Sequence, residues 1–322
     1  MHKHRMHKHR MHNRRRFIGW SAASVASVAG GRFCFANDAT AAKRIGFGFS
    51  LYGMKSLPLV DAIKACADIG YDCVELPVMV DWPAAPEKLS PVARQLLRES
   101  LSNSNLRLSA LMENLPLLGE QSIHANNLAR LRAAGALAHQ LSPASLPVIE
   151  TVMGGRPEQW GDVKVTMVSR LSEWAKIAEE MSTVVAIKAH ISNAAHRPEH
   201  LRWLLDEVRS PWLKAAFDFS HYQLQGIELK AAWDMLGDDV VFIHIKDTVG
   251  DSKKFRFVLP GDGGTNYSEY LQMIRDSSCK ADVVVEVSGQ IHTQPDYDPI
   301  AAAKTSFEAI EPAFKSAGVG PD

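Results

Sequence analysis

The chain alternates short apolar runs with amphipathic segments about eight times, and no other feature restricts its fold as strongly. Each apolar run is six or seven residues long, which is typical of a strand buried on both faces. The eight runs span residues 45–51, 71–76, 106–111, 146–151, 184–190, 213–219, 240–246 and 282–287.

The segments between these runs carry apolar residues every three or four positions, as Leu201, Leu204, Leu205 and Val208 show. That spacing places the apolar side chains on one face of an α-helix, so it predicts helices that pack against the strands. The predicted helices span residues 59–69, 91–102, 123–141, 164–181, 198–208, 229–236, 267–276 and 299–316.

Eight strand–helix units predict an α/β fold, a (β/α)8 TIM barrel, more naturally than an open sheet, because eight strands can close and leave no free edge. The 322-residue chain has no Pro-, Gly- or Ser-rich linker between residues 44 and 315, so we expect one barrel domain over residues 37–322. Residues 77–90 are rich in proline and predict a long loop over the mouth of the barrel.

The first 36 residues have the composition of a cleavable export signal. Three arginines at positions 14–16 precede a weakly apolar stretch, Gly19 to Gly30, and adjacent arginines of this kind indicate the twin-arginine route. Cleavage after Ala36 would release the barrel, and Met11 competes with Met1 as the true start of the chain. We therefore expect a periplasmic or secreted protein.

The alternative for this segment is a disordered basic arm that binds nucleic acid. Eight of the 36 Lys and Arg residues precede Asn37 and no acidic residue does, so the remainder carries 28 basic against 36 acidic residues. An acidic body is a poor match for a phosphate backbone, so we expect no nucleic-acid partner. The apolar stretch is also too short and too mild to span a membrane stably.

Four polar residues stand near the carboxyl ends of the last four predicted strands, where an apolar residue would suit a buried strand. They are Lys188, Asp218, His244 and Glu286. In a closed parallel barrel these ends meet on one face, where catalytic groups gather. Burying an unpaired charge is costly, so these groups must be solvated, paired or bound to a metal. We expect them to share one pocket.

Other polar residues crowd the same rim, on the loops that follow these strands. The residues expected to contact a substrate are His221, Lys246, Gln290 and His292. Salt bridges and helix caps at the strand ends are the alternative explanation. They would account for one such residue more readily than for four consecutive strand ends.

Asp218, His244 and Glu286 together supply two carboxylates and an imidazole. Such a hard-to-borderline set of oxygen and nitrogen donors suits Mn, Mg, Co or Zn. The spacing of these residues along the chain is long, so the site depends on the barrel to bring them together.

Five segments match the pattern of a known family in order and spacing. They are Gly-Tyr-Asp-Cys-Val-Glu-Leu (70–76), Phe-Asp-Phe-Ser-His (217–221), Phe-Ile-His-Ile-Lys-Asp (242–247), Leu-Pro-Gly-Asp-Gly (259–263) and Val-Val-Val-Glu-Val (283–287). On these segments, the chain from Phe47 to Ala302 resembles the xylose isomerase-like TIM barrels, the sugar phosphate isomerase/epimerase group that includes endonuclease IV.

In such proteins a divalent metal is held by Glu, Asp, His and Glu from four successive strand ends. The resemblance implies that Asp218, His244 and Glu286 take the last three places and that His221 takes the substrate-contacting place. The first place departs from the pattern, since Lys188 stands where the family has a glutamate that is both ligand and base. An ammonium cannot coordinate a metal, and it repels one at close range.

Three outcomes follow from Lys188. The metal persists on three protein ligands and water, with Lys188 turned away or deprotonated; or the metal is lost and Lys188 pairs with Asp218 or Glu286. In the third outcome His190, two residues on and facing the same side of the strand, supplies a nitrogen. We expect a retained but altered site for a divalent metal.

The resemblance implies proton transfer at a carbon next to a sugar carbonyl. Glu286 is the obvious base, Lys188 with a lowered pKa could be the second, and His190 completes the expected catalytic set. No arginine-rich phosphate cradle accompanies them, which favours an unphosphorylated sugar or keto-glycoside. The alternatives are a lyase that performs β-elimination on a 3-keto-glycoside and a non-catalytic barrel that binds a sugar.

Overall fold

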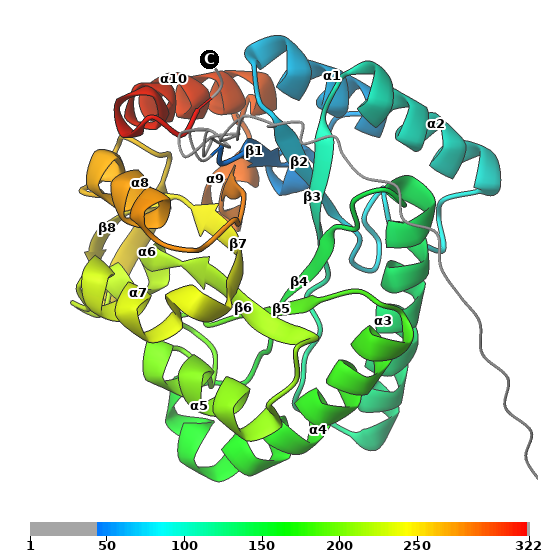
Figure 1. The fold of residues 1–322 in the computed structure, drawn as a ribbon, viewed down its shortest axis with the longest axis vertical. Helices are drawn as coiled ribbons and strands as arrows, with labels where there is room; N and C mark the ends of the chain where they lie inside the picture. The colour runs from blue at the N-terminus through cyan, green and yellow to red at the C-terminus, as the bar shows by residue number, and fades with distance from the viewer. Residues whose placement is uncertain (1–43, 321–322) are drawn as a thin grey trace, which may run out of the picture. The chain divides into compact units, whose positions relative to one another are not determined.

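A computed structural model of the chain describes residues 44–320, and its core is a closed barrel of parallel strands (Figure 1). Around the barrel the strands follow the order β1-β10-β7-β6-β5-β4-β3-β2. The barrel strands are β1 (Phe47–Ser50), β2 (Cys73–Pro77), β3 (Arg107–Met112), β4 (Val148–Val152), β5 (Val185–Lys188), β6 (Leu213–Asp218), β7 (Val240–Ile245) and β10 (Val283–Val285). The predicted (β/α)8 TIM barrel is confirmed.

Long helices form a ring outside the strands, as Figure 1 shows. Each predicted helix is present, and the bounds differ from the prediction by four residues at most. The helices are α1 (Leu59–Ile69), α2 (Pro91–Asn103), α3 (Gln121–Leu141), α4 (Trp160–Glu180), α5 (Pro198–Val208), α7 (Leu229–Leu236), α8 (Tyr267–Asp276) and α10 (Pro299–Ala317).

Helix α10 illustrates how local sequence sets these bounds. The Asp298 carboxylate accepts hydrogen bonds from the backbone N–H groups of Ile300 and Ala301, which otherwise have no partner in the first turn. Pro299 fits the first helical position because its missing N–H is not needed there. Gly318 ends the helix in the left-handed region, at φ 65°.

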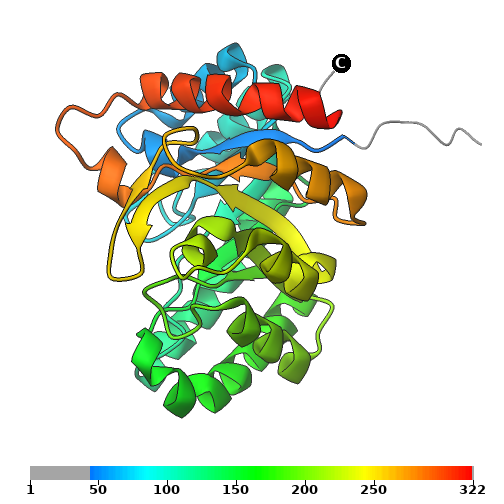
Figure 2. The ribbon, with the colours of Figure 1, turned by 90° about the vertical axis from the view of Figure 1, so that its left-hand side faces the viewer.

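An antiparallel hairpin interrupts the strand–helix alternation between β7 and α8, and the sequence did not predict it. It consists of β8 (Asp247–Asp251) and β9 (Lys254–Val258). Strand β8 requires glycine at position 250, where φ is 102° and an added Cβ would lie 2.1 Å from the Lys254 carbonyl oxygen. The hairpin and the short helix α9 (Gly289–His292) lie at the same end of the barrel (Figure 2).

Shorter helical turns complete the described chain. They are α6 (Phe219–Gln223), directly after β6, and the 3₁₀ turns η1 (Leu51–Met54), η2 (Pro157–Gln159) and η3 (Gly237–Asp239). The predicted long loop over residues 77–90 contains neither helix nor strand beyond the last residue of β2. Part of this loop packs inward, since Val78, Ala84, Ala85 and Leu89 are buried.

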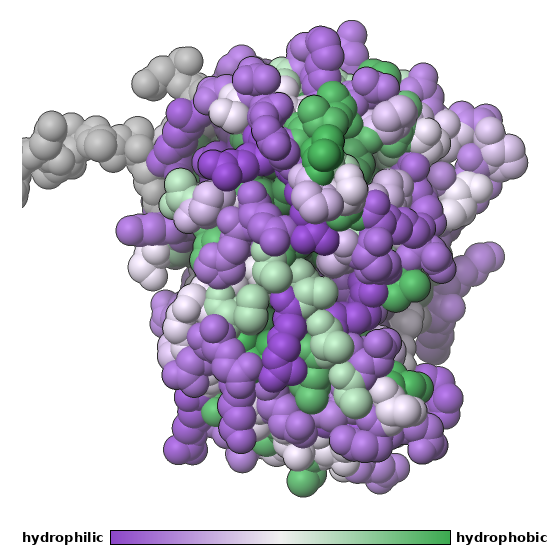
Figure 3. Space-filling view, turned by 90° about the vertical axis from the view of Figure 1, so that its right-hand side faces the viewer, coloured by the Kyte–Doolittle hydropathy of each residue, from purple (hydrophilic) through white to green (hydrophobic). Residues whose placement is uncertain are grey.

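The face drawn in Figure 3 is mainly hydrophilic, with apolar side chains in small groups. None of the helices between residues 44 and 320 has the length and apolar character needed to cross a bilayer. The predicted export signal at residues 1–36 lies outside the described residues.

Trp174 on α4 gives the clearest test of the packing between helices and barrel. Its side chain is fully buried, and the indole N–H has no hydrogen-bond partner among the described residues. We expect Trp174→Ala to lower the free energy of unfolding by about 3–5 kcal/mol, because it leaves a large cavity. Trp174→Phe should cost far less, since it keeps most of the packing and removes only an unpaired donor. Denaturant unfolding of both variants checks this, and equal losses would contradict it.

Candidate active site

The interior of the barrel changes from apolar to charged along the strands. Small and apolar side chains form a layer at the amino end: Cys73, Ala110, Ala186, Ala216, Phe242 and Val284. Side chains alternate in direction along a strand, so the residue two positions later points inward again, closer to the mouth. On five strands that residue is charged or ionisable: Glu75, Lys188, Asp218, His244 and Glu286. The expectation that the last four share one region is met.

Lys188 lies at the centre of this cluster. Its Nζ lies 3.0 Å from Glu286 Oε2, 3.1 Å from Glu150 Oε1 and 2.9 Å from His244 Nδ1. Burial lowers the pKa of Lys188, but Glu150 and Glu286 outweigh that effect and hold it well above the usual value. These surroundings favour the ammonium form of Lys188 and oppose the lowered pKa that a lysine base would need.

Lys246 is a second buried ammonium beside the first. It directly follows β7, and its Nζ donates to Asp218 Oδ2 and, at 3.0 Å, to Glu286 Oε2. The ring of Phe257, on β9, lies 5.1 Å from the same nitrogen. Both lysines thus donate to one oxygen of Glu286, which joins them into a single cationic pair.

Asp218 and Glu286 are held in the ionised form. Burial raises the pKa of each carboxyl, but the neighbouring cations overcome it and place both pKa values well below the usual range. For Asp218 the main cation is Lys246; for Glu286 it is Lys188, followed by Lys246. The Glu286 side chain is 13% exposed and that of Asp218 is fully buried, so Glu286 is the more accessible carboxylate.

His244 lies between two carboxylates of the cluster, Glu75 and Glu286. Its Nε2 lies 2.9 Å from Glu75 Oε2, and its Nδ1 lies 3.0 Å from Glu286 Oε2. Burial disfavours the charged ring, but Glu75 and then Glu286 raise its pKa to about 9 against the opposing effect of Lys188. The imidazolium donates to both carboxylates, whereas the neutral ring accepts from Lys188 at Nδ1. Loss of the Nδ1 proton therefore replaces Glu286 by Lys188 as the partner of Nδ1, while Nε2 keeps Glu75.

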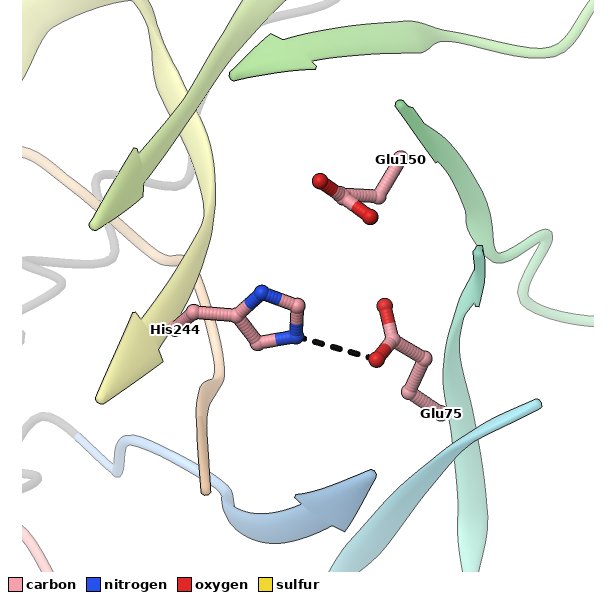
Figure 4. A group of neighbouring side chains, drawn as sticks. All are labelled: Glu75, Glu150 and His244. Carbon is pink, nitrogen blue, oxygen red and sulfur yellow. Dashed lines mark hydrogen bonds and ion pairs between the residues drawn. The ribbon is translucent and has the colours of Figure 1, made fainter. Parts of the chain in front are cut away.

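Two glutamates beneath this cluster were not predicted as site residues. Glu75 and Glu150 extend from β2 and β4 toward His244 (Figure 4). Glu75 accepts from Ser50 Oγ and from His244, and among residues 44–320 Lys188 is the ion partner of Glu150. Burial raises the pKa of Glu150. Each is a glutamate inside an apolar strand run, which is the signal that identified the other four.

The two remaining histidines near the mouth form a pair. The His190 and His221 rings lie 4.1 Å apart, and His221 Nε2 lies 3.3 Å from Asp218 Oδ2. Burial lowers the pKa of both histidines, so both are neutral at pH 7. Strand β5 ends at Lys188, so His190 lies beyond the strand and its Nδ1 accepts from the Ser192 N–H at 3.1 Å. It belongs to neither group of donors close enough to share an ion.

Gln290 and His292 lie further from the charged cluster. Gln290 Oε1 accepts from the backbone N–H of Phe257 at 2.9 Å, which fastens α9 to the hairpin. His292 packs edge-on against Tyr52, with ring centroids 4.6 Å apart, in a cavity of 530 Å³ that Trp82 also lines. Burial and then the charge of Glu286 raise the pKa of Tyr52, so this cavity lies within electrostatic range of the cluster.

The Leu-Pro-Gly-Asp-Gly segment has a structural role that explains its glycines. Asp247, which is fully buried, accepts from the N–H groups of Gly261 at 2.9 Å and Gly263 at 3.0 Å, and from the Tyr267 hydroxyl at 3.1 Å. A Cβ at position 263 would lie 2.8 Å from Asp247 Cβ. Asp247 therefore anchors the loop that returns from the hairpin.

We expect Asp247→Asn to lower the free energy of unfolding by about 2–3 kcal/mol. The amide NH₂ of asparagine is a donor, and it would face either the Gly261 N–H or the Tyr267 hydroxyl, which are donors too. Asp262→Asn, in the exposed part of the same loop, should change it by less than about 0.5 kcal/mol. Thermal unfolding measures both. Equal stability of the two variants would show that these buried contacts contribute little.

Two groups of donors in the described residues lie close enough to share a metal ion, with all ligand atoms within 4.8 Å of one another. They are Glu75, Glu150 and His244, and Asp218, His244 and Glu286. The second group is the predicted trio, so the barrel does bring these donors together. Carboxylate and imidazole donors of this kind could hold a divalent ion.

The two ammonium groups do not fit such an ion in the present arrangement. Lys246 contacts the donor oxygens of Asp218 and Glu286, and Lys188 contacts those of Glu286 and His244. An ammonium cannot be a ligand, and an ion on these donors would lie close to two positive charges. In this structure the partners of Asp218, His244 and Glu286 are therefore lysine side chains.

The sequence profile of the xylose isomerase-like TIM barrel family matches residues 63–313. Fructoselysine 3-epimerase from Escherichia coli O157:H7 is 21% identical over 261 residues, which cover 77% of this chain and 92% of that protein. The crystal structure of the IOLI protein with a zinc atom bound superposes with a TM-score of 0.70 at 18% identity, over 84% of this chain and 99% of that one. The 3-keto-D-glucoside 4-epimerase from E. coli gives a TM-score of 0.66 at 13% identity, over 84% and 100%.

Proposed function

The chain belongs to the xylose isomerase-like TIM barrel family, and on that premise we propose that it is a sugar isomerase/epimerase-like enzyme that moves a proton at the carbon next to a sugar carbonyl. The observation that carries this proposal is Glu286. It is an ionised carboxylate at the mouth side of the cluster, and two ammonium groups lie 3.0 Å from one of its oxygens. A base beside fixed cations is what enolisation needs.

In this proposal Glu286 takes the proton from the carbon, and the carbonyl oxygen becomes an enediolate oxygen that faces the ammonium groups. The same cations keep Glu286 a weak base until a substrate oxygen competes for their N–H groups. Its basicity then rises at the moment when the proton is removed. Lys188, as an ammonium held between Glu150 and Glu286, supplies positive charge near that oxygen in this scheme.

The neutral histidines His190 and His221 are the groups we assign to the substrate's hydroxyl groups. They pack together at the mouth, and His221 is oriented by Asp218. His244 has a protonated form that is paired with carboxylates and a neutral form that is paired with Lys188. It is therefore the candidate for returning the proton to the substrate carbon. Gln290 and His292 would act at longer range, through the hairpin and through the cavity beside Tyr52.

The test is incorporation of solvent deuterium. We expect the protein, incubated in heavy water with a panel of keto sugars, to exchange the hydrogen next to the carbonyl of at least one of them, read by NMR or mass spectrometry. Sugar binding without exchange would instead favour the non-catalytic barrel. Failure to bind or to exchange any member of the panel would count against both assignments.

A second candidate is β-elimination from a 3-keto-glycoside, and one observation favours it. Epimerisation needs proton transfer on both faces of the substrate. Glu286, however, is the one acid of the cluster whose side chain is even partly accessible, since Glu75, Glu150 and Asp218 are fully buried. In β-elimination one base removes the proton and the glycosidic oxygen then leaves, so a single accessible carboxylate is enough. Release of the aglycone from a 3-keto-glycoside would identify the lyase, and its absence with deuterium exchange would identify the epimerase.

We also propose that the protein is exported, on the twin-arginine-like segment at residues 14–30. An exported enzyme would meet free glycosides rather than sugar phosphates. Replacing Arg14 and Arg15 by Lys should retain the protein in the cytoplasm. Normal export of that variant would exclude the twin-arginine route.

A further inference from the structure

Two buried ammonium groups converge on the region where the family places its ion. Lys188 from β5 and Lys246 after β7 both donate to Glu286 Oε2 at 3.0 Å, and their side chains are 4% and 2% exposed. Between them they also contact the ligand atoms of Asp218 and His244. Every donor of the predicted metal trio is therefore already paired with a lysine.

We propose that the Lys188–Lys246 pair takes the place of the divalent ion, so that this chain binds and polarises the oxygen of its carbonyl substrate without a metal. The inference rests on the proposed function for the identity of the substrate, but not for the absence of a metal. Two ammonium groups carry the same total charge as one divalent ion, and their N–H groups supply directed hydrogen bonds to an oxyanion.

The two lysines have different parts in this arrangement. Lys188 Nζ donates to Glu286 Oε2 and lies between Glu150 Oε1, its ion partner at 3.1 Å, and His244 Nδ1 at 2.9 Å. Lys188 is therefore fixed and acts as a counter-charge. Lys246 has two polar acceptors among residues 44–320, and its remaining side faces the Phe257 ring at 5.1 Å. Its third N–H is the donor left for a ligand, so the ligand class is an oxyanion or polarised carbonyl at the end of β7.

Metal binding by the full-length purified protein tests this directly. We expect mass spectrometry to find well under one equivalent of transition metal, and 1 mM Mn²⁺ or Zn²⁺ to change the melting temperature by less than about 1 °C. Dialysis against EDTA should change the rate of deuterium exchange by less than about twofold. One bound equivalent of metal, or loss of exchange on chelation that metal restores, would overturn the proposal.

Lys188→Glu is expected to create metal binding, because it removes one ammonium and adds a carboxylate at the place where the family has a ligand. We expect this variant to bind one equivalent of Mn²⁺ and to melt about 5 °C or more higher with 1 mM Mn²⁺ than without it. Lys188→Gln, which removes the charge but adds no carboxylate, should bind less tightly by at least tenfold. A folded Lys188→Glu protein that gains no affinity would contradict the assignment.

The wild-type measurements decide the question even where Lys188→Glu fails to fold. They also separate this inference from the proposed function. A metal-free protein that catalyses no deuterium exchange into any sugar would contradict the enzyme assignment alone. Exchange that depends on a metal would contradict the proposed role of the lysine pair alone.

Discussion

Glu286→Gln is expected to reduce solvent deuterium exchange by about 10²–10⁴-fold while leaving the barrel folded. The amide has nearly the same shape and its oxygen can still accept from Lys188 and Lys246, but it cannot take up a proton from carbon. Exchange is measured by NMR on whichever keto sugar the wild type turns over. The melting temperature of the variant shows whether the fold is retained.

Glu228→Gln is the matched control for this variant, since Glu228 is an exposed glutamate that precedes α7 and makes no side-chain cap. It should leave both exchange and stability within experimental error of the wild type. Glu286→Asp should retain part of the activity, because it keeps the base but withdraws it from the substrate by one methylene. Substantial exchange in Glu286→Gln would remove Glu286 from the mechanism.

Lys188→Met should lower the free energy of unfolding by about 3–5 kcal/mol at neutral pH, because it leaves the buried Glu150 carboxylate without its ion partner. The loss should depend on pH. Burial already raises the pKa of Glu150, and removal of Lys188 should raise it further. A carboxyl whose folded-state pKa is raised is most destabilising above that pKa, so the loss should shrink as the pH falls toward the ordinary glutamate range.

Urea unfolding of wild type and variant at pH 5 and pH 8 measures this difference. The double variant Lys188→Met, Glu150→Gln should recover most of the lost stability at pH 8, since it removes the buried charge along with its partner. A loss that is the same at both pH values, or a double variant as unstable as Lys188→Met, would show that Glu150 is not the group responsible.

The strand and helix segments could be predicted closely because their signals are local. Runs such as residues 240–246 are buried on both faces, and helices such as α5 carry a regular apolar stripe, so burial and period identify them without any tertiary information. The β8–β9 hairpin escaped prediction because its strands are short and partly exposed, and they are held by contacts such as Gln290 to Phe257.

The site was predicted in part, and the division has a physical cause. Lys188, Asp218, His244 and Glu286 stood out because each places an ionisable group at the end of an apolar strand. Glu75 and Glu150 give the same signal in the first half of the chain, yet a single strand does not show which carboxylates will meet. His190 lies two residues beyond the end of β5, beside His221, and belongs to neither group of donors close enough to share an ion.

The sequence alone determined the closed barrel, the face on which its charged groups gather, and the departure of Lys188 from the family's ligand pattern, since all three follow from periodicity and residue chemistry along the chain. Only the tertiary structure decided what Lys188 does there. Its protonation and its partners depend on Glu150, Glu286 and Lys246, which lie 38 or more residues away, and electrostatic energy depends on distance in space rather than along the chain.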